Sequence, residues 1–314
     1  MPAPRLPQLK GDIFLTDGGL ETTLVFHEGF ELPLFAAFTL LRSANGRDVL
    51  TRYFQRYLEI ARDQSLGFIL ESPTWRASAD WGGRLGYTRE DIAEANRDAI
   101  QLMRDLAARH SRDVHPIVVS GCVGPRGDGY DPGQIMTPEK AEAYHAHQIG
   151  AFAAAGADLT TAITMTNAPE AIGVTRAAVA AGLPVAISFT LETDGRLPTG
   201  QPLGWAIAEV DEATGSAPAY YMINCAHPSH FQDVLATQAA WTRRIRGLRA
   251  NASCRSHQEL DAAPDLDDGN PAELGEQYRE ILRRHPQITV LGGCCGTDHR
   301  HVTCIGASCR SIAA

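Results

Sequence analysis

The strongest constraint on the fold is a regular alternation of short apolar runs with segments of helical period. Each run is rich in Val, Ile, Leu or Phe and leads into a polar turn, which is typical of strands buried on both faces of a parallel sheet. Residues 139–156 illustrate the helical segments, with Pro138 as a start signal and Gly156 as a stop. The apolar runs cover residues 12–19, 66–74, 115–125, 156–164, 183–190, 219–228, 243–253 and 287–296.

Eight such runs in 314 residues predict a (β/α)8 TIM barrel, a single α/β domain over residues 1–314. The competing architecture is an open dinucleotide-binding sheet, which carries G-x-G-x-x-G after its first strand. This chain has "DGGLET" there, at residues 17–22, so the barrel is favoured. The acidic, turn-rich residues 256–275 are expected to form a long surface connection between the last two strands.

Composition restricts the partners and the compartment. The net charge is −9 and no run is rich in Lys and Arg, so we expect no nucleic-acid partner. We find neither a signal-peptide pattern nor an apolar run of about 18 residues or more, so we expect no membrane partner and a cytoplasmic location. A homo-oligomer is compatible with this composition. In a reducing compartment the seven cysteines are expected to be thiols, metal ligands or catalysts rather than disulfides.

Three cysteines stand where predicted strands end. Cys225 follows the sixth apolar run, and Cys294 and Cys295 close the eighth. The active site of such a barrel lies at the carboxyl ends of its strands, so these thiols are expected on one rim. The same rim receives the end of the first strand, Asp17-Gly18-Gly19, and that of the second, residues 71–75.

The adjacent cysteines need a physical reason. A disulfide between them is disfavoured because neighbouring Cα atoms are ~3.8 Å apart and disulfides usually span ~4.4–6.8 Å. Neighbouring strand side chains point to opposite faces, so both thiols reach one point only where the chain leaves strand geometry. Glycines permit that departure, and here they are Gly292, Gly293 and Gly296.

Two interpretations of the cysteines remain open at this point. A zinc ion held by Cys225, Cys294 and Cys295 would have an open fourth position, which is typical of a catalytic zinc site. The alternative is a set of buried thiols that pack as small hydrophobic groups. His299 and His301 are expected to begin the last helix, with a capping or solvent-facing role rather than metal binding.

Five motifs together resemble the homocysteine S-methyltransferase family over residues 12–306: "DGGLETTL", "SGCVGP", "DGRLPTGQPL", "INCAHP" and "LGGCCGTDHRHV". The resemblance implies a zinc-dependent barrel that transfers a methyl group from an onium donor to homocysteine, giving methionine in methionine biosynthesis. Its three zinc ligands, which are also its catalytic centre, correspond to Cys225, Cys294 and Cys295. S-methylmethionine, S-adenosylmethionine and betaine all fit the donor class, and a related thiol or selenol fits the acceptor class.

The resemblance also suggests substrate-binding residues. Asp17, with Gly18 and Gly19, corresponds to the carboxylate that binds the amino group of homocysteine. Trp75 is expected to offer an aromatic face to the cationic donor, and Asn224 to orient the zinc site. The competing interpretations are a turn carboxylate for Asp17, ordinary packing for Trp75 and backbone satisfaction for Asn224.

One position departs from the family. A glutamate that usually ends the fourth strand is replaced by Ile163, in "TAITMTN". An acceptor amino group would therefore lose one of its two partners. Two functions follow as alternatives: a zinc-dependent methyltransferase of small thiols, or a barrel that binds zinc or thiols without turnover.

Overall fold

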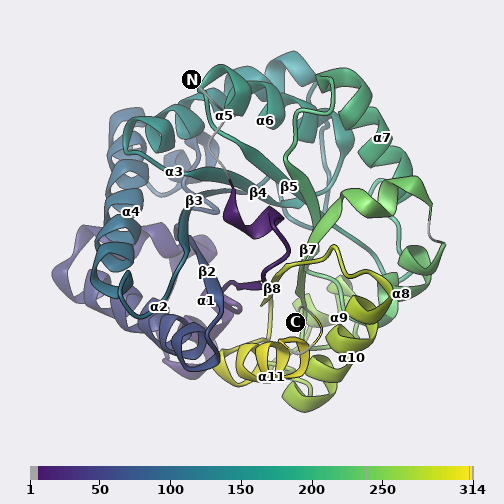
Figure 1. The fold of residues 1–314 in the computed structure, drawn as a ribbon. Coiled ribbons are helices and arrows are strands. Elements are labelled where there is room, and N and C mark those ends of the chain that lie inside the picture. The colour runs from purple at the N-terminus through teal and green to yellow at the C-terminus, as the bar shows by residue number, and fades with distance from the viewer. Residues whose placement is uncertain (1–5, 238, 311, 313–314) are drawn as a thin grey trace.

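Eight parallel strands close into a barrel, which confirms the predicted TIM barrel (Figure 1). The computed structural model describes residues 6–237, 239–310 and 312 of the chain. Each strand pairs in parallel with its neighbours in chain order, and β8 pairs with β1 to close the sheet. The strands are β1 (Phe14–Leu15), β2 (Gly67–Glu71), β3 (Ile117–Val123), β4 (Leu159–Met165), β5 (Val185–Thr190), β6 (Tyr220–Asn224), β7 (Ile245–Ala250) and β8 (Val290–Gly293).

Helices follow the strands along the chain, and the long ones form a ring around the barrel (Figure 1). They are α1 (Leu20–Thr22), α2 (Ala44–Gln64), α3 (Ala79–Arg84), α4 (Arg89–His110), α5 (Pro138–Ala154), α6 (Ala168–Ala180), α7 (Leu203–Thr214), α8 (Pro228–Ala236), α9 (His257–Asp261), α10 (Pro271–Arg284) and α11 (His299–Cys309). No helix in the described ranges is both long enough and apolar enough to cross a membrane.

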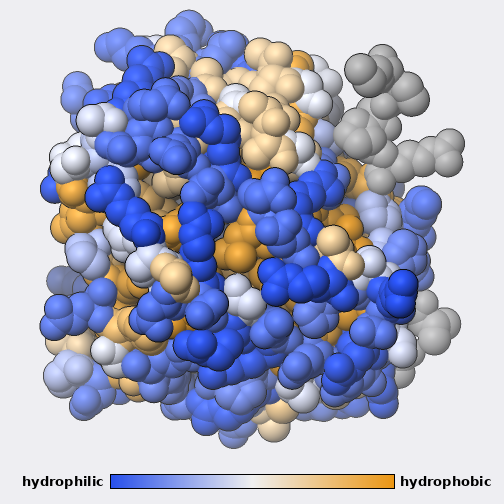
Figure 2. All heavy atoms as spheres, turned by 90° about the vertical axis from the view of Figure 1, so that its left-hand side faces the viewer, coloured by the Kyte–Doolittle hydropathy of each residue, from blue (hydrophilic) through white to orange (hydrophobic). Residues whose placement is uncertain are grey.

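Helix α2 shows why these segments become helices on the barrel wall. Ser43 caps it by accepting a hydrogen bond from the Gly46 backbone, and Ser65 ends it in a left-handed conformation. Its apolar residues recur every three or four positions, so one stripe faces the strands and the other face meets solvent. The side of the molecule to the left of Figure 1 is accordingly mostly hydrophilic, with hydrophobic atoms in small patches (Figure 2).

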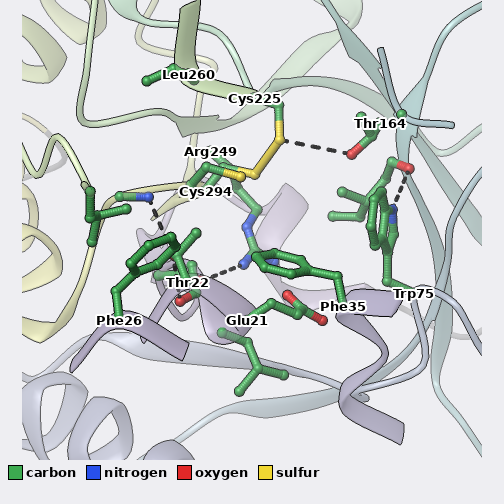
Figure 3. Close-up of a pocket in the computed structure, with 18 of the residues that line it drawn as sticks. Glu21, Thr22, Phe26, Phe35, Trp75, Thr164, Cys225, Arg249, Leu260 and Cys294 are labelled. Atoms are coloured by element: carbon green, nitrogen blue, oxygen red, sulfur yellow. Dashed lines mark hydrogen bonds between the residues drawn. A yellow bond between two sulfur atoms is a disulfide. The ribbon is translucent and has the colours of Figure 1, made fainter. Parts of the chain in front are cut away.

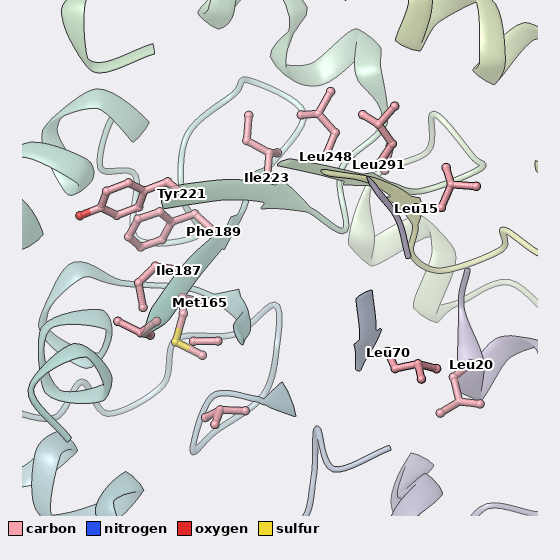
Figure 4. Packing of buried hydrophobic residues seen from close by; sticks show 14 of the residues in the cluster. Leu15, Leu20, Leu70, Met165, Ile187, Phe189, Tyr221, Ile223, Leu248 and Leu291 are labelled. Atoms are coloured by element: carbon pink, nitrogen blue, oxygen red, sulfur yellow. The ribbon is translucent and has the colours of Figure 1, made fainter. Parts of the chain in front are cut away.

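The strands alternate between two apolar layers. Tyr221 and Ile223 of β6 belong to the large cluster between strands and helices, which Figure 4 shows from close by. Tyr220 and Met222 belong instead to a smaller cluster to which most strands contribute, so it fills the barrel interior. Continuing this alternation by one position directs the last residue of β6, Asn224, into the barrel. The same step places Glu71 of β2 and Arg249 of β7 inside.

The N-terminal segment covers the opposite end of the interior. Leu6 packs into the interior cluster, and the Gln8 carbonyl accepts a hydrogen bond of 2.7 Å from the Thr289 hydroxyl. The Gln8 amide lies 3.5 Å from the Tyr220 hydroxyl. The carboxyl ends of the strands are therefore the end that remains for a site.

Candidate metal centre and substrate cavity

The three predicted cysteines converge at the carboxyl end of the barrel. Cys225 follows β6 directly, and Cys294 and Cys295 follow β8. Their sulfur atoms all lie within 4.8 Å of one another, and all three residues line one cavity of about 470 Å³. The prediction that they share one rim is confirmed.

The oxidation state differs from the expected one. The structure joins Cys225 and Cys294 by a disulfide, while Cys295 is a free thiol (Figure 3). The two Cα atoms are 5.5 Å apart, a separation that a disulfide can span. Sulfur atoms close enough to share a metal ion are also close enough to oxidise, which sequence spacing alone could not reveal. In the reduced protein these two atoms are the thiols of the candidate metal centre.

Fewer of the glycines beside the cysteines leave strand geometry than expected. Only Gly296 of the three glycines has a left-handed conformation, with φ of +77°, and Cys225 itself adopts φ of +51°. Gly292 and Gly293 stay within β8, where added side chains would collide with Thr16 and Thr297. These two glycines therefore permit close packing of the β8 turn, and the change of direction occurs after Cys295.

Polar groups on β4 and β6 surround two of the sulfur atoms. The Asn224 side chain lies 3.9 Å from Cys294 Sγ, and the Thr164 hydroxyl lies 3.9 Å from Cys225 Sγ. Asn224 is itself fixed, because its Oδ1 accepts hydrogen bonds from the Thr164 amide at 2.9 Å and from the Ser188 hydroxyl at 2.6 Å. The Asn224 side chain therefore contacts both a cysteine sulfur atom and a backbone amide.

Tyr130 and His257 contact the third cysteine, Cys295, and the backbone of Cys225. The Tyr130 hydroxyl lies 3.5 Å from Cys295 Sγ, and its ring stacks on His257 with the centroids 3.9 Å apart. His257 Nε2 lies 2.6 Å from the Cys225 carbonyl oxygen. Tyr130 comes from the β3–α5 loop and His257 begins α9 in the β7–α10 connection, so two segments outside the strands contact the cysteines.

The donor set suits zinc. Three thiolates are the soft ligands that zinc prefers, and the residues around them contribute amide and hydroxyl groups rather than a fourth strong ligand. Burial raises the pKa of the Cys295 thiol, so this sulfur keeps its proton at neutral pH unless a cation lies beside it. A bound metal would supply that cation and leave one coordination position facing the cavity.

A buried charge cluster forms the floor of the cavity beside the cysteines. Arg249 donates to Asp17 Oδ1 at 2.7 Å and also forms an ion pair with Glu71. The Tyr53 hydroxyl donates to the other Asp17 oxygen at 3.1 Å. The side chains of Arg249, Asp17 and Glu71 are 8%, 6% and 5% exposed. Asp17 is therefore inside the predicted pocket, but the protein already provides its partner.

The charges of this cluster depend on one another. Burial raises the pKa of Asp17 and of Glu71, and Arg249 counteracts that rise. Burial alone would lower the pKa of Arg249, but the two carboxylates hold it above its usual value, so the guanidinium stays charged. The cluster is a cation held between two acids.

Aromatic and apolar side chains form the cavity walls. Trp75 donates a hydrogen bond of 3.4 Å from its indole to the Ile163 carbonyl, and both residues line the cavity. Phe35 lines the cavity near Glu21, on the side opposite the Cys225–Cys294 pair in the view of Figure 3. The remaining apolar wall residues include Phe26, Leu260 and Leu266. The walls suit a small organic molecule with a cationic centre.

Glu21 and Arg76 are charged residues of the cavity that lie outside the buried cluster. Burial raises the pKa of Glu21 to about 7. The Arg76 guanidinium lies over the Trp75 ring at 4.8 Å and over the Trp81 ring at 3.9 Å, and 3.5 Å from Asp128. One face of Trp75 is therefore covered by a cation of the protein.

Comparison with known proteins decides the family. The family model described as homocysteine S-methyltransferase matches residues 14–309. The chain belongs to the homocysteine S-methyltransferase family. It is therefore a member of a family of methyltransferases.

Solved structures show the same fold. The oxidised form of the homocysteine methyltransferase MmuM from Escherichia coli has a TM-score of 0.73 and 21% identity, covering 95% of this chain and 96% of that one. The metallated form of MmuM has a TM-score of 0.71 and 20% identity, covering 95% of this chain and 96% of that one. At this identity the likeness extends to the fold alone.

The other residues predicted from the sequence have the following positions in the structure. Gly18 and Gly19 line the cavity where the β1 turn approaches the β8 turn, since a side-chain atom on Gly19 would lie 2.6 Å from the Cys294 carbonyl oxygen. His301 helps to cap α11, as expected, because its Nδ1 accepts from the Asp298 amide at 3.1 Å. Residues 256–275 do connect β7 with β8, but they contain α9, and Leu260 and Asp261 form part of the cavity wall.

Sequence reasoning missed Arg249, Tyr130 and His257. Arg249 had a usable signal, because a charged residue at an inward position of a buried strand needs a buried partner. Tyr130 lies in a loop and His257 begins the short helix α9, and neither segment has a periodicity that predicts which way a side chain points.

Proposed function

We propose that this protein is a zinc-dependent S-methyltransferase that moves a methyl group from an onium donor to a small thiol, with homocysteine or a related thiol or selenol as the acceptor. The convergence of Cys225, Cys294 and Cys295 on one cavity carries the proposal. A reducing compartment, as we expect for this chain, would keep all three sulfur atoms available as ligands.

Zinc on these three residues would lower the pKa of an acceptor thiol so that it reacts as a thiolate. The thiolate sulfur forms a bond to the methyl carbon while the bond from that carbon to the positive sulfur or nitrogen of the donor breaks. The donor leaves as a neutral sulfide or amine, and the acceptor proton is released to solvent. Because the leaving group is neutral, the reaction needs alignment rather than an acid catalyst.

The residues of this chain provide that alignment. Asn224 and Thr164 hold Cys294 and Cys225 from the strand side. Asp17, with Gly18 and Gly19, forms the floor beneath the acceptor, and Trp75 forms a wall for the donor. The resemblance assigns Asp17 to an acceptor amino group, and Arg249 competes with such a group for the same carboxylate.

The test combines metal content with a substrate screen. Reduced, zinc-loaded protein is incubated with homocysteine, selenohomocysteine or 4-mercaptobutanoate, each with S-methylmethionine, S-adenosylmethionine or betaine, and methylated products are identified by mass spectrometry. We expect one zinc per chain and methylation of at least one acceptor. Cys295→Ala should lose both, and Cys254→Ala, at an exposed cysteine outside the cluster, should keep both. Metal binding without any methylated product would instead favour a zinc-binding barrel without turnover.

A further inference from the structure

We propose that the acceptor is a small thiol without an ammonium group, because Arg249 occupies the position that such a group would need. This inference rests on the proposed function, since it concerns the thiol bound at the same site. It follows from three features of the cavity: the bonds of Arg249, the bonds of Asp17 and the apolar end of β4.

Four hydrogen bonds hold the Arg249 side chain in the cavity floor. Its Nε donates to the Gly293 carbonyl at 3.0 Å, and Nη2 donates to Asp17 at 2.7 Å and to the Gly18 carbonyl at 3.2 Å. Nη1 donates to Glu71. These contacts tie the ends of β1, β2, β7 and β8 together around one buried cation. The guanidinium is therefore a structural part of the floor and does not swing away to admit a second cation.

Both carboxylate oxygens of Asp17 already have a partner within the protein. One carboxylate oxygen accepts from Arg249 at 2.7 Å and the other from the Tyr53 hydroxyl at 3.1 Å. An ammonium group bound to Asp17 would lie beside the guanidinium, and like charges in a buried site repel each other. An acceptor without that group binds the same floor with no such penalty.

The β4 side offers no replacement carboxylate. Ile163 lines the cavity there and is 7% exposed, so an ammonium group would meet an apolar side chain. Among the other acids of the cavity, Asp128 lies 3.5 Å from Arg76, and Asp267 lies 3.4 Å from Arg255. Asp261 and Asp265 come from the β7–α10 connection.

Glu21 is the remaining acid near the aromatic wall, and within the described residues it makes no ion pair. Methyl transfer brings one unavoidable cation into the cavity, that of the onium donor. Glu21 and the neighbouring Phe35 suit that cation. Asp261 and Asp265 also make no ion pair within the described residues, but both are exposed on the β7–α10 connection. Charge balance thus assigns Glu21 to the donor and leaves the acceptor no buried, unpaired acid of the cavity.

The decisive comparison uses wild-type protein loaded with cobalt(II) and two acceptors that differ only in the amino group. Homocysteine and 4-mercaptobutanoate have the same chain length, thiol and carboxylate. Dissociation constants are read from the change in the cobalt absorption spectrum as each thiol binds, so the measurement needs no turnover. We expect 4-mercaptobutanoate to bind ~10-fold or more tightly than homocysteine, because an ammonium without a partner loses a charged hydrogen bond.

The outcomes separate this inference from the proposed function. Homocysteine binding as tightly as 4-mercaptobutanoate, or more tightly, would overturn the inference and leave the thiol methyltransferase in place. If neither thiol changes the cobalt spectrum, both proposals are overturned together. If 4-mercaptobutanoate binds preferentially but no donor methylates it, the inference holds and only the transfer reaction is lost.

Variants test whether Arg249 is the cause. Arg249→Met combined with Ile163→Glu removes the competing cation and restores a β4 acid, so the preference should shift toward homocysteine by ~10-fold or more. Arg246→Met is the matched control, since Arg246 lies on the same strand but reaches the Leu9 carbonyl at the opposite end of the barrel. Its preference should equal that of wild type. Glu21→Gln should weaken the binding of both acceptors equally or of neither. A selective loss of homocysteine binding would show that Glu21 binds the amino group and would overturn the inference.

Discussion

The sulfur side and the charged side of the cavity differ in how far they follow the family. On the sulfur side, Cys225, Cys294 and Cys295 converge in space, as the resemblance to the family predicts. On the charged side, Ile163 stands where the resemblance predicts a carboxylate, and Arg249 lies between Asp17 and Glu71. The two sides come from strands of the same barrel, so this difference lies in the side chains and not in the fold.

The difference shows which part of such a site is free to vary. Thiol activation depends on three sulfur atoms within bonding reach of one ion, and among the described residues Cys225, Cys294 and Cys295 form the group that lies that close together. Recognition of the acceptor depends on the balance of charge, which a residue of the protein can satisfy as well as a substrate can. A family member can therefore keep the reaction and change its acceptor. The following variants examine the two sides separately.

Removing one ligand should have the largest effect on activity and little on stability. Cys295→Ala leaves only two sulfur ligands, so zinc binding and methyl transfer should fall by ~1,000-fold or more, while the midpoint of thermal unfolding of the metal-free protein changes by less than ~2 °C. Zinc content and initial rates test the first part, and calorimetry tests the second. A variant that keeps its metal would show that Cys295 is not a ligand.

Removing the buried cation should mainly affect stability. Arg249→Met leaves Asp17 and Glu71 buried without a counter-charge and should lower the free energy of unfolding by ~3–5 kcal/mol. The loss should grow as pH rises above about 4, because carboxyls whose folded pKa is raised stabilise the protonated folded state at low pH and lose that contribution as pH increases. Urea unfolding at pH 5 and pH 8 measures both effects. A loss that is equal at the two pH values would contradict the description of the floor as a cation between two acids.

Removing the hydroxyl group beside Cys295 should have a moderate effect on zinc affinity. Tyr130→Phe keeps the ring that stacks on His257 but removes the hydroxyl 3.5 Å from Cys295 Sγ. Loss of such a contact to a metal ligand should weaken zinc binding ~10- to 100-fold without changing the ratio of affinities for the two acceptors. Competition with a chelator gives the zinc affinity. Tyr144→Phe is the control. The Tyr144 hydroxyl lies 3.0 Å from the Ser78 hydroxyl, and neither residue lines the cavity.

The same comparison explains what the sequence could predict. Alternation of apolar runs predicted all eight strands, and the cysteine motifs placed three thiols on one rim, because both depend on local pattern and on strand order. The disulfide between Cys225 and Cys294 and the ion pairs of Arg249 join residues far apart in the chain. Their formation depends on distances of a few ångströms across the barrel, and a motif read along the chain does not contain those distances.

The smallest expected effect belongs to Glu21, which lines the cavity beside Phe35. Burial raises the pKa of Glu21 to about 7, against an ordinary value of 4.5, so between these two values the folded protein binds a proton that the unfolded chain has released. Stability contributed by the protonated carboxyl is therefore complete at low pH and is lost as pH rises through 7. Glu21→Gln removes this titration. The midpoint of thermal unfolding of wild type, relative to the variant, should drop by ~1–2 °C between pH 5 and pH 8. Glu28→Gln, on the same stretch of chain outside the cavity, should track wild type across that range. If the difference between wild type and Glu21→Gln stays constant with pH, Glu21 is already ionised in the folded protein, and its carboxylate is available to an onium donor at every pH tested.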